Sequence, residues 1–361
     1  MQASVLREVP GQASLEDVDI DRPGPFEVLV RVAACGLCHS DLHIMNGTLL
    51  GAVTAPAVLG HEVAGIVESV GASVTEFAVG DHVVGCTSRY CGQCAQCLEG
   101  HTYLCANRKL LTRAEPRLTL DGEAVAQAGG LGGFAEYILV GQDALVRVPD
   151  EVPLDRAALL GCAVITGAGS VMNGAKVVAG SSVVVFGCGG IGLNAIQAAA
   201  ISGASRVIAV DMSDEKLELA KVFGATDVVD IREGDTVGRI LSLSGGGVDY
   251  AFDCVGRPET VADAVSVLWP ARTAYLVGVP GPDARLALPA AQMIFQGKGV
   301  QGLLMGANNF KRDIPRLADM YLRGILKLDE LVGERIGLSE VNAAVERMTS
   351  GGVARSVVVF D

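Results

Sequence analysis

Four cysteines within fifteen residues form a pattern that could hold a metal ion. Thiolates two residues apart can converge on one tetrahedral Zn²⁺, and a fourth at the end of a short loop closes the shell. A closed all-sulfur shell leaves no position for a substrate, so the pattern predicts a structural zinc. Free thiols or disulfides are the alternative, which the even spacing of the first three cysteines does not favour. The four residues are Cys91, Cys94, Cys97 and Cys105.

A glycine-rich turn follows a buried apolar run and precedes a helical pattern. Its sequence is Gly187-Cys188-Gly189-Gly190-Ile191-Gly192, a GxGxxG motif. Such glycines let the backbone approach a pyrophosphate at a helix N-terminus. Asp211 ends the next apolar run, where a carboxylate accepts hydrogen bonds from ribose hydroxyls and repels a 2′-phosphate. We therefore predict dinucleotide binding with NAD preferred over NADP. A structural glycine turn with a helix-capping aspartate is the alternative.

Further metal-binding side chains are scattered along the chain. Cys38 lies in a CHSD segment, His61 and Glu62 lie in a GHE segment, and Cys162 comes much later. No spacing rule joins them, so by residue type alone they are only candidates. A single buried cysteine or histidine is more often part of an apolar core.

Two kinds of domain must position these residues. Short alternating runs over 26–35, 62–71 and 81–86 predict strands of an irregular, mostly-β first domain. The polar, glycine-containing segment 108–133 is expected to be a surface excursion. From about Cys162 apolar strand patterns alternate with helix patterns, which predicts an α/β domain with a parallel sheet and helices on both faces.

The expected α/β elements are strands over 181–187, 206–211, 248–256 and 273–279, and helices over 191–204, 213–225 and 258–268. Helix patterns over 314–324 and 338–351 precede a last strand over 355–360, which is expected to rejoin the first domain. We therefore expect a first domain over 1–163, a dinucleotide-binding domain over 164–304, and a return to the first domain over 305–361.

Composition narrows the class of protein. The 361 residues are 50% hydrophobic, enough for two cores, and the formal net charge is −13. Such a charge argues against nucleic acid and anionic membranes as partners. The chain shows neither a signal peptide nor a transit peptide, and its ten cysteines fit a reducing compartment, so a cytoplasmic protein is expected. The apolar run 181–204 contains polar residues and glycines, which favours a strand-turn-helix over a membrane span.

With these motifs together, the chain resembles the zinc-dependent medium-chain alcohol dehydrogenases. The resemblance covers nearly the whole length, through CGLCHSDLH, GHEVAGIVESVG, the four-cysteine segment, GCAVITGAG, the glycine-rich turn with Asp211, and ARSVVVF. It implies a GroES-like mostly-β catalytic domain and a Rossmann domain that binds NAD. It also implies a second zinc, bound by Cys38, His61 and Cys162, with a fourth position open for catalysis.

The resemblance assigns roles to further residues. It places Glu62 beside the catalytic zinc and makes Asp41 the acceptor for the far nitrogen of His61. Ser40 and His43 would carry the substrate proton to solvent. The cofactor contacts implied in this way, besides the glycine-rich turn and Asp211, are His39, Lys216, Val277, Gly278, Val279 and Arg355. The cysteines without a role, expected to be small apolar residues, are Cys35, Cys86, Cys188 and Cys254.

The substrate is less well determined by the sequence. The segment 43–60 has no acidic residue and Thr87 is small, which predicts a roomy apolar pocket for medium-length or aromatic primary alcohols. The alternative is a formaldehyde dehydrogenase that depends on mycothiol or glutathione, with Lys109, Arg113 or Arg117 binding the thiol. The GRPET, VGVPGPDARLALP and GERIGLSEV segments resemble the actinobacterial enzymes that include the mycothiol-dependent type. A non-catalytic redox sensor that binds NAD and zinc is a third possibility, and a homodimer is expected.

Overall fold

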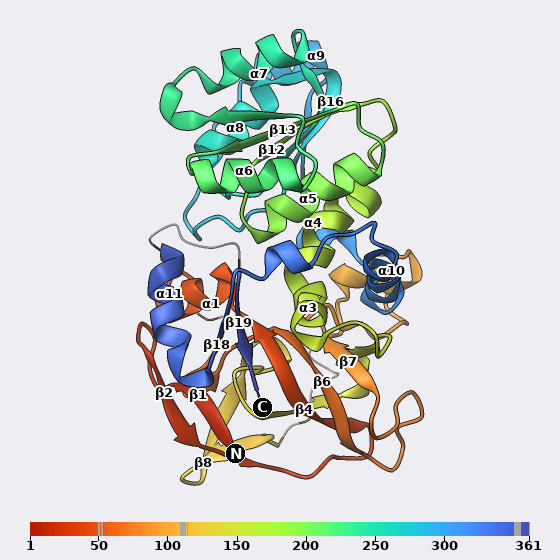
Figure 1. Ribbon diagram of the computed structural model, residues 1–361, viewed down its shortest axis with the longest axis vertical. Coiled ribbons are helices and arrows are strands. Elements are labelled where there is room, and N and C mark those ends of the chain that lie inside the picture. Colours follow the sequence, from red (N-terminus) through yellow and green to blue (C-terminus); the bar gives the residue numbers. More distant parts are fainter. Residues whose placement is uncertain (50, 52, 109–112, 114, 350–354, 361) are drawn as a thin grey trace. The chain divides into compact units, whose positions relative to one another are not determined.

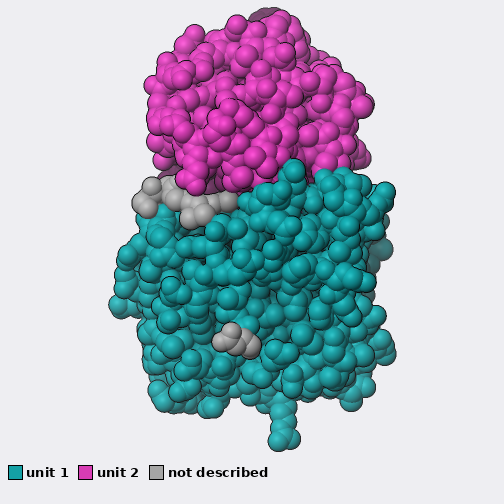
Figure 2. All heavy atoms as spheres, viewed as in Figure 1, with its two compact units in different colours: residues 1–163, 309–361 teal, residues 164–308 magenta. Residues whose placement is uncertain are grey.

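The computed structural model describes residues 1–49, 51, 53–108, 113, 115–349 and 355–360. The chain divides into two compact units (Figure 2). Unit 1 comprises residues 1–163 and 309–361, and unit 2 comprises residues 164–308. The chain therefore returns to unit 1 at residue 309 rather than at residue 305.

Unit 1 is mostly β-structure, as its alternating pattern predicts. Its strands are β1 Gln2–Leu6, β2 Ala13–Asp17, β3 Asp19–Ile20, β4 Glu27–Gly36, β5 Ala57–Val58, β6 Glu62–Val70, β7 His82–Gly85, β8 Leu118–Leu120, β9 Glu123–Gln127, β10 Tyr137–Gly141, β11 Leu145–Arg147, β18 Glu334–Ile336 and β19 Ser356–Val359. They form one sheet in the order β2-β1-β5-β9-β8-β3. A second sheet has the order β11-β7-β6-β4-β19-β18, with β10 also paired to β4. The expected return of the last strand is confirmed, because β19 pairs antiparallel with β4.

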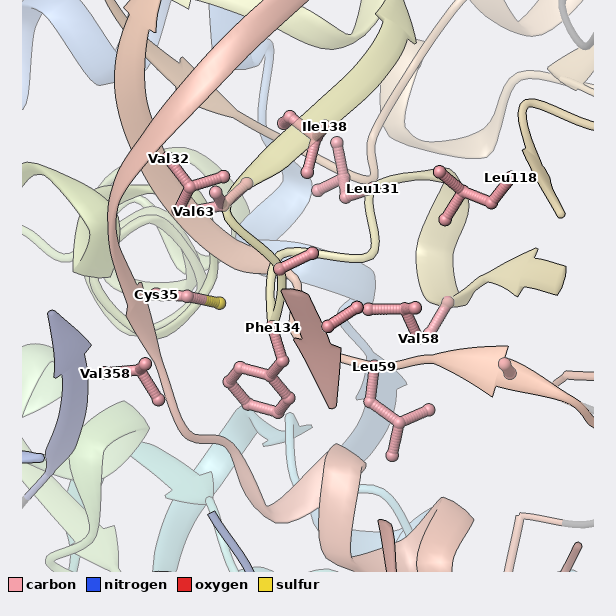
Figure 3. Close-up of a cluster of buried hydrophobic side chains, with 14 of the residues drawn as sticks. Val32, Cys35, Val58, Leu59, Val63, Leu118, Leu131, Phe134, Ile138 and Val358 are labelled. Atoms are coloured by element: carbon pink, nitrogen blue, oxygen red, sulfur yellow. The ribbon is translucent and has the colours of Figure 1, made fainter. Parts of the chain in front are cut away.

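The core of unit 1 gathers apolar side chains from both ends of the chain. Figure 3 shows Phe134 and Cys35 within a cluster that also contains Val358. Cys35 is fully buried there, as expected for a small apolar residue. The expected surface excursion over 108–133 is wrong for its described second half: β8 and β9 form an antiparallel hairpin, and Leu118 and Leu131 are buried in this core. The alternating apolar residues of this segment outweigh its polar average.

Helices of unit 1 connect or cover these strands. The helices are α1 His39–Met45, α2 Ala95–Leu98, α3 Leu154–Leu159, α10 Phe310–Leu322 and α11 Val341–Thr349, with short 3₁₀ turns at Thr102–Leu104, Ala128–Gly130, Gln142–Ala144, Asp329–Leu331 and Leu338–Glu340. Figure 1 labels α1, α3, α10 and α11 among the strands of this unit.

Unit 2 contains the expected parallel sheet. Its strands are β12 Ser182–Phe186, β13 Arg206–Asp211, β14 Asp227–Asp230, β15 Val248–Asp253, β16 Leu268–Leu276 and β17 Gly299–Gly302; its helices are α4 Ile165–Gly169, α5 Gly190–Ile201, α6 Asp214–Val222, α7 Thr236–Ser244, α8 Pro258–Ser266 and α9 Ala290–Gln296. The order is β14-β13-β12-β15-β16-β17, and every neighbouring pair is parallel. Helices α5 to α8 pack against these strands (Figure 1).

Among the described residues, one helical segment is long and apolar enough to cross a membrane. It runs over Leu154–Ala175, and 83% of its most apolar window is buried inside the fold, as in a core helix. The segment consists of α3, a π-helical turn over Leu160–Val164, α4, and a second π-helical turn over Ser170–Ala175. Cys162 lies in the first of these π-turns, which are frequent at functional sites.

Candidate metal and cofactor sites

Four ligand side chains that are far apart in the sequence converge in unit 1. Ligand atoms of Cys38, His61, Glu62 and Cys162 all lie within 4.8 Å of one another, and all four residues are buried. The pairing of β4 with β6 brings the first three together, because Gly36 at the end of β4 lies opposite Glu62 at the start of β6, and the π-helical turn Leu160–Val164 carries Cys162. Cys38 then follows β4 as the residue that precedes α1.

Asp41 lies beside this cluster and orients Cys38 and His61. Its carboxylate is fully buried and accepts hydrogen bonds from the Cys38 and Gly60 N–H groups at 3.0 and 3.1 Å. Its Oδ1 also lies 3.3 Å from Nδ1 of His61, which leaves Nε2 for a metal. Burial lowers the pKa of His61, but the charges of Asp41 and Cys38 outweigh it and raise that pKa well above its ordinary value. Asp41 and Cys38 therefore favour positive charge at the position of His61.

Arg355 and Glu62 form a buried ion pair beside the ligands. Arg355 Nη2 lies 3.2 Å from Glu62 Oε1, and Nη1 donates to the Leu37 carbonyl at 2.8 Å. Burial raises the pKa of Glu62 to about 8, although Arg355 opposes the shift. Neither Glu62 oxygen accepts a hydrogen bond from the described residues. A carboxylate with open lone pairs is thus aimed at the cluster.

The donor set fits zinc. Two thiols, one imidazole and one carboxylate are ligands that Zn²⁺ takes in tetrahedral sites. The Cys162 thiol donates to Cys38, and Arg355 and His61 lie nearby, which together hold the pKa of Cys38 well below its ordinary value. Gly36 makes room for the set, because a Cβ there would lie 2.3 Å from Glu62 Oε2 and 2.8 Å from Leu159. The sequence patterns did not single out Gly36.

The four-cysteine segment forms a second cluster, which is local and partly exposed. Ligand atoms of the four cysteines lie within 4.8 Å of one another. The Sγ atoms of Cys94 and Cys97 are 3.4 Å apart, too far for a disulfide, and all ten cysteines of the chain are unpaired. Backbone N–H groups, first that of Cys97, lower the pKa of Cys94 to about 6. Burial and the neighbouring Cys94 instead raise the pKa of Cys97 to about 12, so the fit to an all-sulfur zinc site rests on the convergence of the four sulfur atoms.

Unit 2 carries the glycine-rich turn between β12 and α5. Gly187 has a φ of +89°, and a Cβ at Gly192 would lie 1.7 Å from the Gly187 carbonyl oxygen, so only glycine fits at Gly192. A Cβ added at Gly189 would meet no other atom within 4 Å, which leaves the backbone open to a ligand. Asp211 accepts hydrogen bonds from the N–H groups of Cys188 at 2.7 Å, Met212 at 2.8 Å and Ser213 at 3.1 Å. Asp211 therefore also anchors the turn.

The remaining predicted cofactor residues occupy the same edge of the sheet or helix α1. Lys216 lies in the first turn of α6, where its N–H donates to Ser213 Oγ at 3.5 Å. Val277 and Gly278 follow β16, and their N–H groups both donate to the Asp253 carbonyl. His39 is exposed at the start of α1, in unit 1.

Helix α1 also carries the predicted proton relay. Ser40 and His43 are both partly exposed, and the Cys38 thiol lies 3.8 Å from Ser40 Oγ. The rings of His39 and His43 meet edge to face with centroids 6.4 Å apart, as residues four apart on one helix face can. The helix thus leads from a metal ligand toward more exposed side chains.

Thr87 lies next to the metal cluster, as does a segment that the sequence analysis missed. A Cβ at Gly129 would lie 2.7 Å from Thr87 Cγ2 and 3.6 Å from His61 Cβ. Gly129 has a φ of +62°, within the 3₁₀ turn Ala128–Gly130. The AGGLGG run was the available signal, since consecutive glycines often mark a close approach of backbone to another group.

Two of the candidate thiol-binding cations are already paired. Arg117 is buried and its Nε lies 2.7 Å from Glu27 Oε1, while Arg113 Nη1 lies 3.0 Å from Glu27 Oε2. Arg113 also pairs with Asp21. Glu27 begins β4, so at about 3.3 Å per residue this group lies roughly 30 Å along the strand from Gly36. Lys109 lies outside the described residues.

Comparison with known proteins agrees with this arrangement. A family model described as the alcohol dehydrogenase GroES-like domain matches residues 24–150, and one described as zinc-binding dehydrogenase matches residues 190–321. The geraniol dehydrogenase of Carpoglyphus lactis is 36% identical and covers 99% of this chain and 97% of its own. The class-3 alcohol dehydrogenase of Myxine glutinosa is 35% identical over the same shares.

Solved structures are equally similar. The benzyl alcohol dehydrogenase of Acinetobacter calcoaceticus has a TM-score of 0.92 at 34% identity and covers 100% of this chain and 99% of its own. A zinc-binding dehydrogenase of Sinorhizobium meliloti, solved with NADP bound, has a TM-score of 0.85 at 29% identity and covers 99% of each chain.

Proposed function

The chain belongs to the zinc-dependent medium-chain dehydrogenase/reductase family, and from that premise we propose that it oxidises uncharged primary alcohols to aldehydes with NAD. The observation that carries the proposal is the convergence of Cys38, His61, Glu62 and Cys162 from three distant segments. Two thiols and one imidazole with a neighbouring carboxylate leave room for a substrate oxygen, unlike the closed four-cysteine cluster.

The chain's own residues would support the reaction in distinct ways. Cys38, His61 and Cys162 would hold the catalytic zinc, and Asp41 fixes the orientation of His61. When bound, the zinc supplies a Lewis acid that lowers the pKa of the substrate hydroxyl, and NAD supplies the hydride acceptor. Ser40 receives the hydroxyl proton and His43 passes it to solvent, so that each turnover yields an aldehyde, NADH and one proton.

The cofactor proposal rests on the turn and the carboxylate beside it. The open backbone at Gly189 suits a pyrophosphate. Asp211 disfavours a 2′-phosphate by charge. Lys216 is proposed to contact the adenosine ribose, and Val277, Gly278 and Val279 the nicotinamide. Since a similar structure contains NADP, the preference for NAD depends on Asp211 in this chain and not on the family.

Small residues beside the metal ligands support a bulky, uncharged substrate. Thr87 and Gly129 lie close to His61 and are both small residues, although they pack closely against each other. Two similar proteins are named for geraniol and benzyl alcohol, both primary alcohols with large apolar tails. Each buried methylene is worth about 0.8 kcal/mol, so kcat/KM should rise up to several-fold per carbon until the pocket is filled.

The test compares substrates directly. kcat/KM with NAD is measured from ethanol to octanol and for cinnamyl alcohol, beside formaldehyde with and without glutathione or mycothiol. A rising series supports the proposal. A flat series together with thiol-dependent formaldehyde oxidation would instead favour the thiol-dependent alternative. No turnover with any of them would favour a non-catalytic redox sensor.

The described arginines do not support the thiol-dependent alternative. Arg113 and Arg117 already neutralise Glu27 and lie near the opposite end of β4 from the metal ligands. Substituting them would break a buried ion pair and change stability rather than the KM for a thiol adduct. Within that alternative, Lys109 is the cation to substitute.

We also propose that the protein is a homodimer in a reducing compartment such as the cytoplasm, where ten unpaired cysteines remain reduced. β17 is the last strand of its sheet, and α9 nearby exposes 77% of Ile294 and 87% of Phe295. An open strand edge beside exposed apolar side chains suits a second copy of the chain. Phe295→Asp should shift the mass measured by light scattering from dimer to monomer.

A further inference from the structure

Strand β15 ends at Asp253, a buried carboxylate that has no role in the proposed reaction. Asp253 is fully buried, and its Oδ1 accepts hydrogen bonds from the Thr260 hydroxyl at 2.7 Å and the Val255 N–H at 3.3 Å. Its Oδ2 accepts one from the Gly256 N–H at 3.0 Å. Burial raises the pKa of Asp253, and these donors oppose that shift. The side chain therefore holds the loop 254–257 in one conformation.

This loop packs backbone to backbone against the next one. Gly256 has a φ of +83°, and a Cβ there would lie 2.8 Å from the carbonyl of Val279. A Cβ at Gly278 would lie 2.4 Å from the Gly256 nitrogen. The Asp253 carbonyl also accepts hydrogen bonds from the N–H groups of Val277 and Gly278, both at 2.9 Å. The two loops, 254–257 and 277–279, thus pack as a pair, and both are hydrogen-bonded to Asp253.

The first of these loops also contacts the glycine-rich turn. A Cβ at Gly187 would lie 2.8 Å from Val255 Cγ2, so the Val255 side chain lies against the first glycine of the turn. The three segments follow β12, β15 and β16, which are neighbours in the parallel sheet. Ligands of such sheets bind at the carboxyl ends of the strands. One buried carboxylate therefore supports three loops at the edge expected to bind the cofactor.

We propose that Asp253 is the positioning residue for the nicotinamide half of the cofactor. The inference rests on the proposed NAD-dependent function. Asp253 fixes loop 254–257, this loop fixes 277–279 by close packing, and the second loop is the proposed nicotinamide contact. The adenosine half depends more on Asp211 and on the glycine-rich turn, which keeps its own hydrogen bond from the Cys188 N–H group to Asp211.

The experiment separates the two halves of the cofactor. Binding of NADH and of ADP-ribose, which lacks nicotinamide, is measured in the wild type and in Asp253→Asn, without any alcohol. Asparagine has one acceptor oxygen instead of two, so either the Val255 or the Gly256 N–H group would lose its acceptor. We expect the Kd for NADH to rise about tenfold, as for one lost buried hydrogen bond with a charged acceptor, and the Kd for ADP-ribose to rise less than about threefold.

Asp249→Asn is the matched control. Asp249 is a carboxylate at the opposite end of β15 that accepts hydrogen bonds from the Ser182 N–H and hydroxyl and pairs with Arg272. Its loss should lower stability and leave the Kd for both ligands within about twofold of the wild type, because it lies at the amino end of the sheet.

The outcomes are distinct. Equal weakening of NADH and ADP-ribose by Asp253→Asn, or no weakening, would overturn the positioning role. A wild type that binds neither ligand would instead contradict the proposed cofactor. If Asp253→Asn does not fold, Thr260→Val is measured instead, because it removes one of the three hydrogen bonds to Asp253. A rise of about threefold in the Kd for NADH alone supports the proposal. An unchanged ratio of the Kd for NADH to the Kd for ADP-ribose rejects it.

Discussion

The two metal-binding clusters of unit 1 use the same kind of ligand in opposite ways. The four-cysteine cluster is contiguous in sequence, with three of its cysteines partly exposed, and its ligand atoms come from one short segment. The Cys38, His61, Glu62 and Cys162 cluster is fully buried and assembled by the pairing of β4 with β6 and by the π-turn that carries Cys162. A local cluster can order its own segment, whereas an assembled cluster needs the fold before it exists.

The largest expected effect breaks the assembled cluster. Cys38→Ser replaces a thiolate by a hydroxyl that stays protonated, so zinc affinity and turnover should collapse, by about 10³-fold or more in kcat/KM. The fold should survive, because β4 and β6 do not depend on the thiol. Activity, zinc content and NADH binding are measured together. NADH binding within about twofold of the wild type would show that the loss is chemical.

The next effect breaks the local cluster. Cys97→Ser should lower stability by several kcal/mol or reduce soluble yield, because binding of a structural zinc contributes folding free energy. Thermal unfolding is compared with that of Cys254→Ala, a substitution of a cysteine outside both clusters. An unchanged melting temperature of a Cys97→Ser protein that has lost zinc would show that the four-cysteine segment does not need the metal.

Substitution of one glycine in each cluster should affect the two clusters differently. In the assembled cluster Gly36 is required by crowding, since its Cβ would meet Glu62, so Gly36→Ala should lower kcat by about tenfold or more. In the local cluster Gly100 has a φ of +90° and no atom within 4 Å of its Cβ position. Gly100→Ala should therefore cost about 1 kcal/mol of stability and leave kcat unchanged. A loss of kcat in Gly100→Ala would erase the distinction.

The same contrast explains what could be predicted from the sequence. Strand 206–211 and the four-cysteine cluster depend on local periodicity and spacing, and the structure has both where the sequence indicates them. Cys38, His61 and Cys162 could be joined only through resemblance to a family. Gly36, Gly129 and Asp253 were missed because their roles are contacts between segments distant in sequence. The β8–β9 hairpin was missed because its polar average hid an alternating apolar pattern.

The smallest effect is expected from substituting His43, the proposed proton carrier next to the assembled cluster. His43→Gln should slow alcohol oxidation several-fold without changing zinc content, because it removes a proton carrier and not a ligand. Added imidazole should partly restore the rate. Single-turnover measurements are needed where release of NADH limits turnover. Rates equal to the wild type, with and without imidazole, would remove His43 from the proton path.

We expect the two clusters to hold separate zinc ions with different roles. The test is metal analysis of fully loaded wild type, Cys38→Ser and Cys97→Ser, with activity measured on the same samples. We expect two zinc ions per chain in the wild type and one in each variant, with turnover absent in Cys38→Ser and retained per folded molecule in Cys97→Ser. A single zinc ion in active, fully loaded wild type would contradict it.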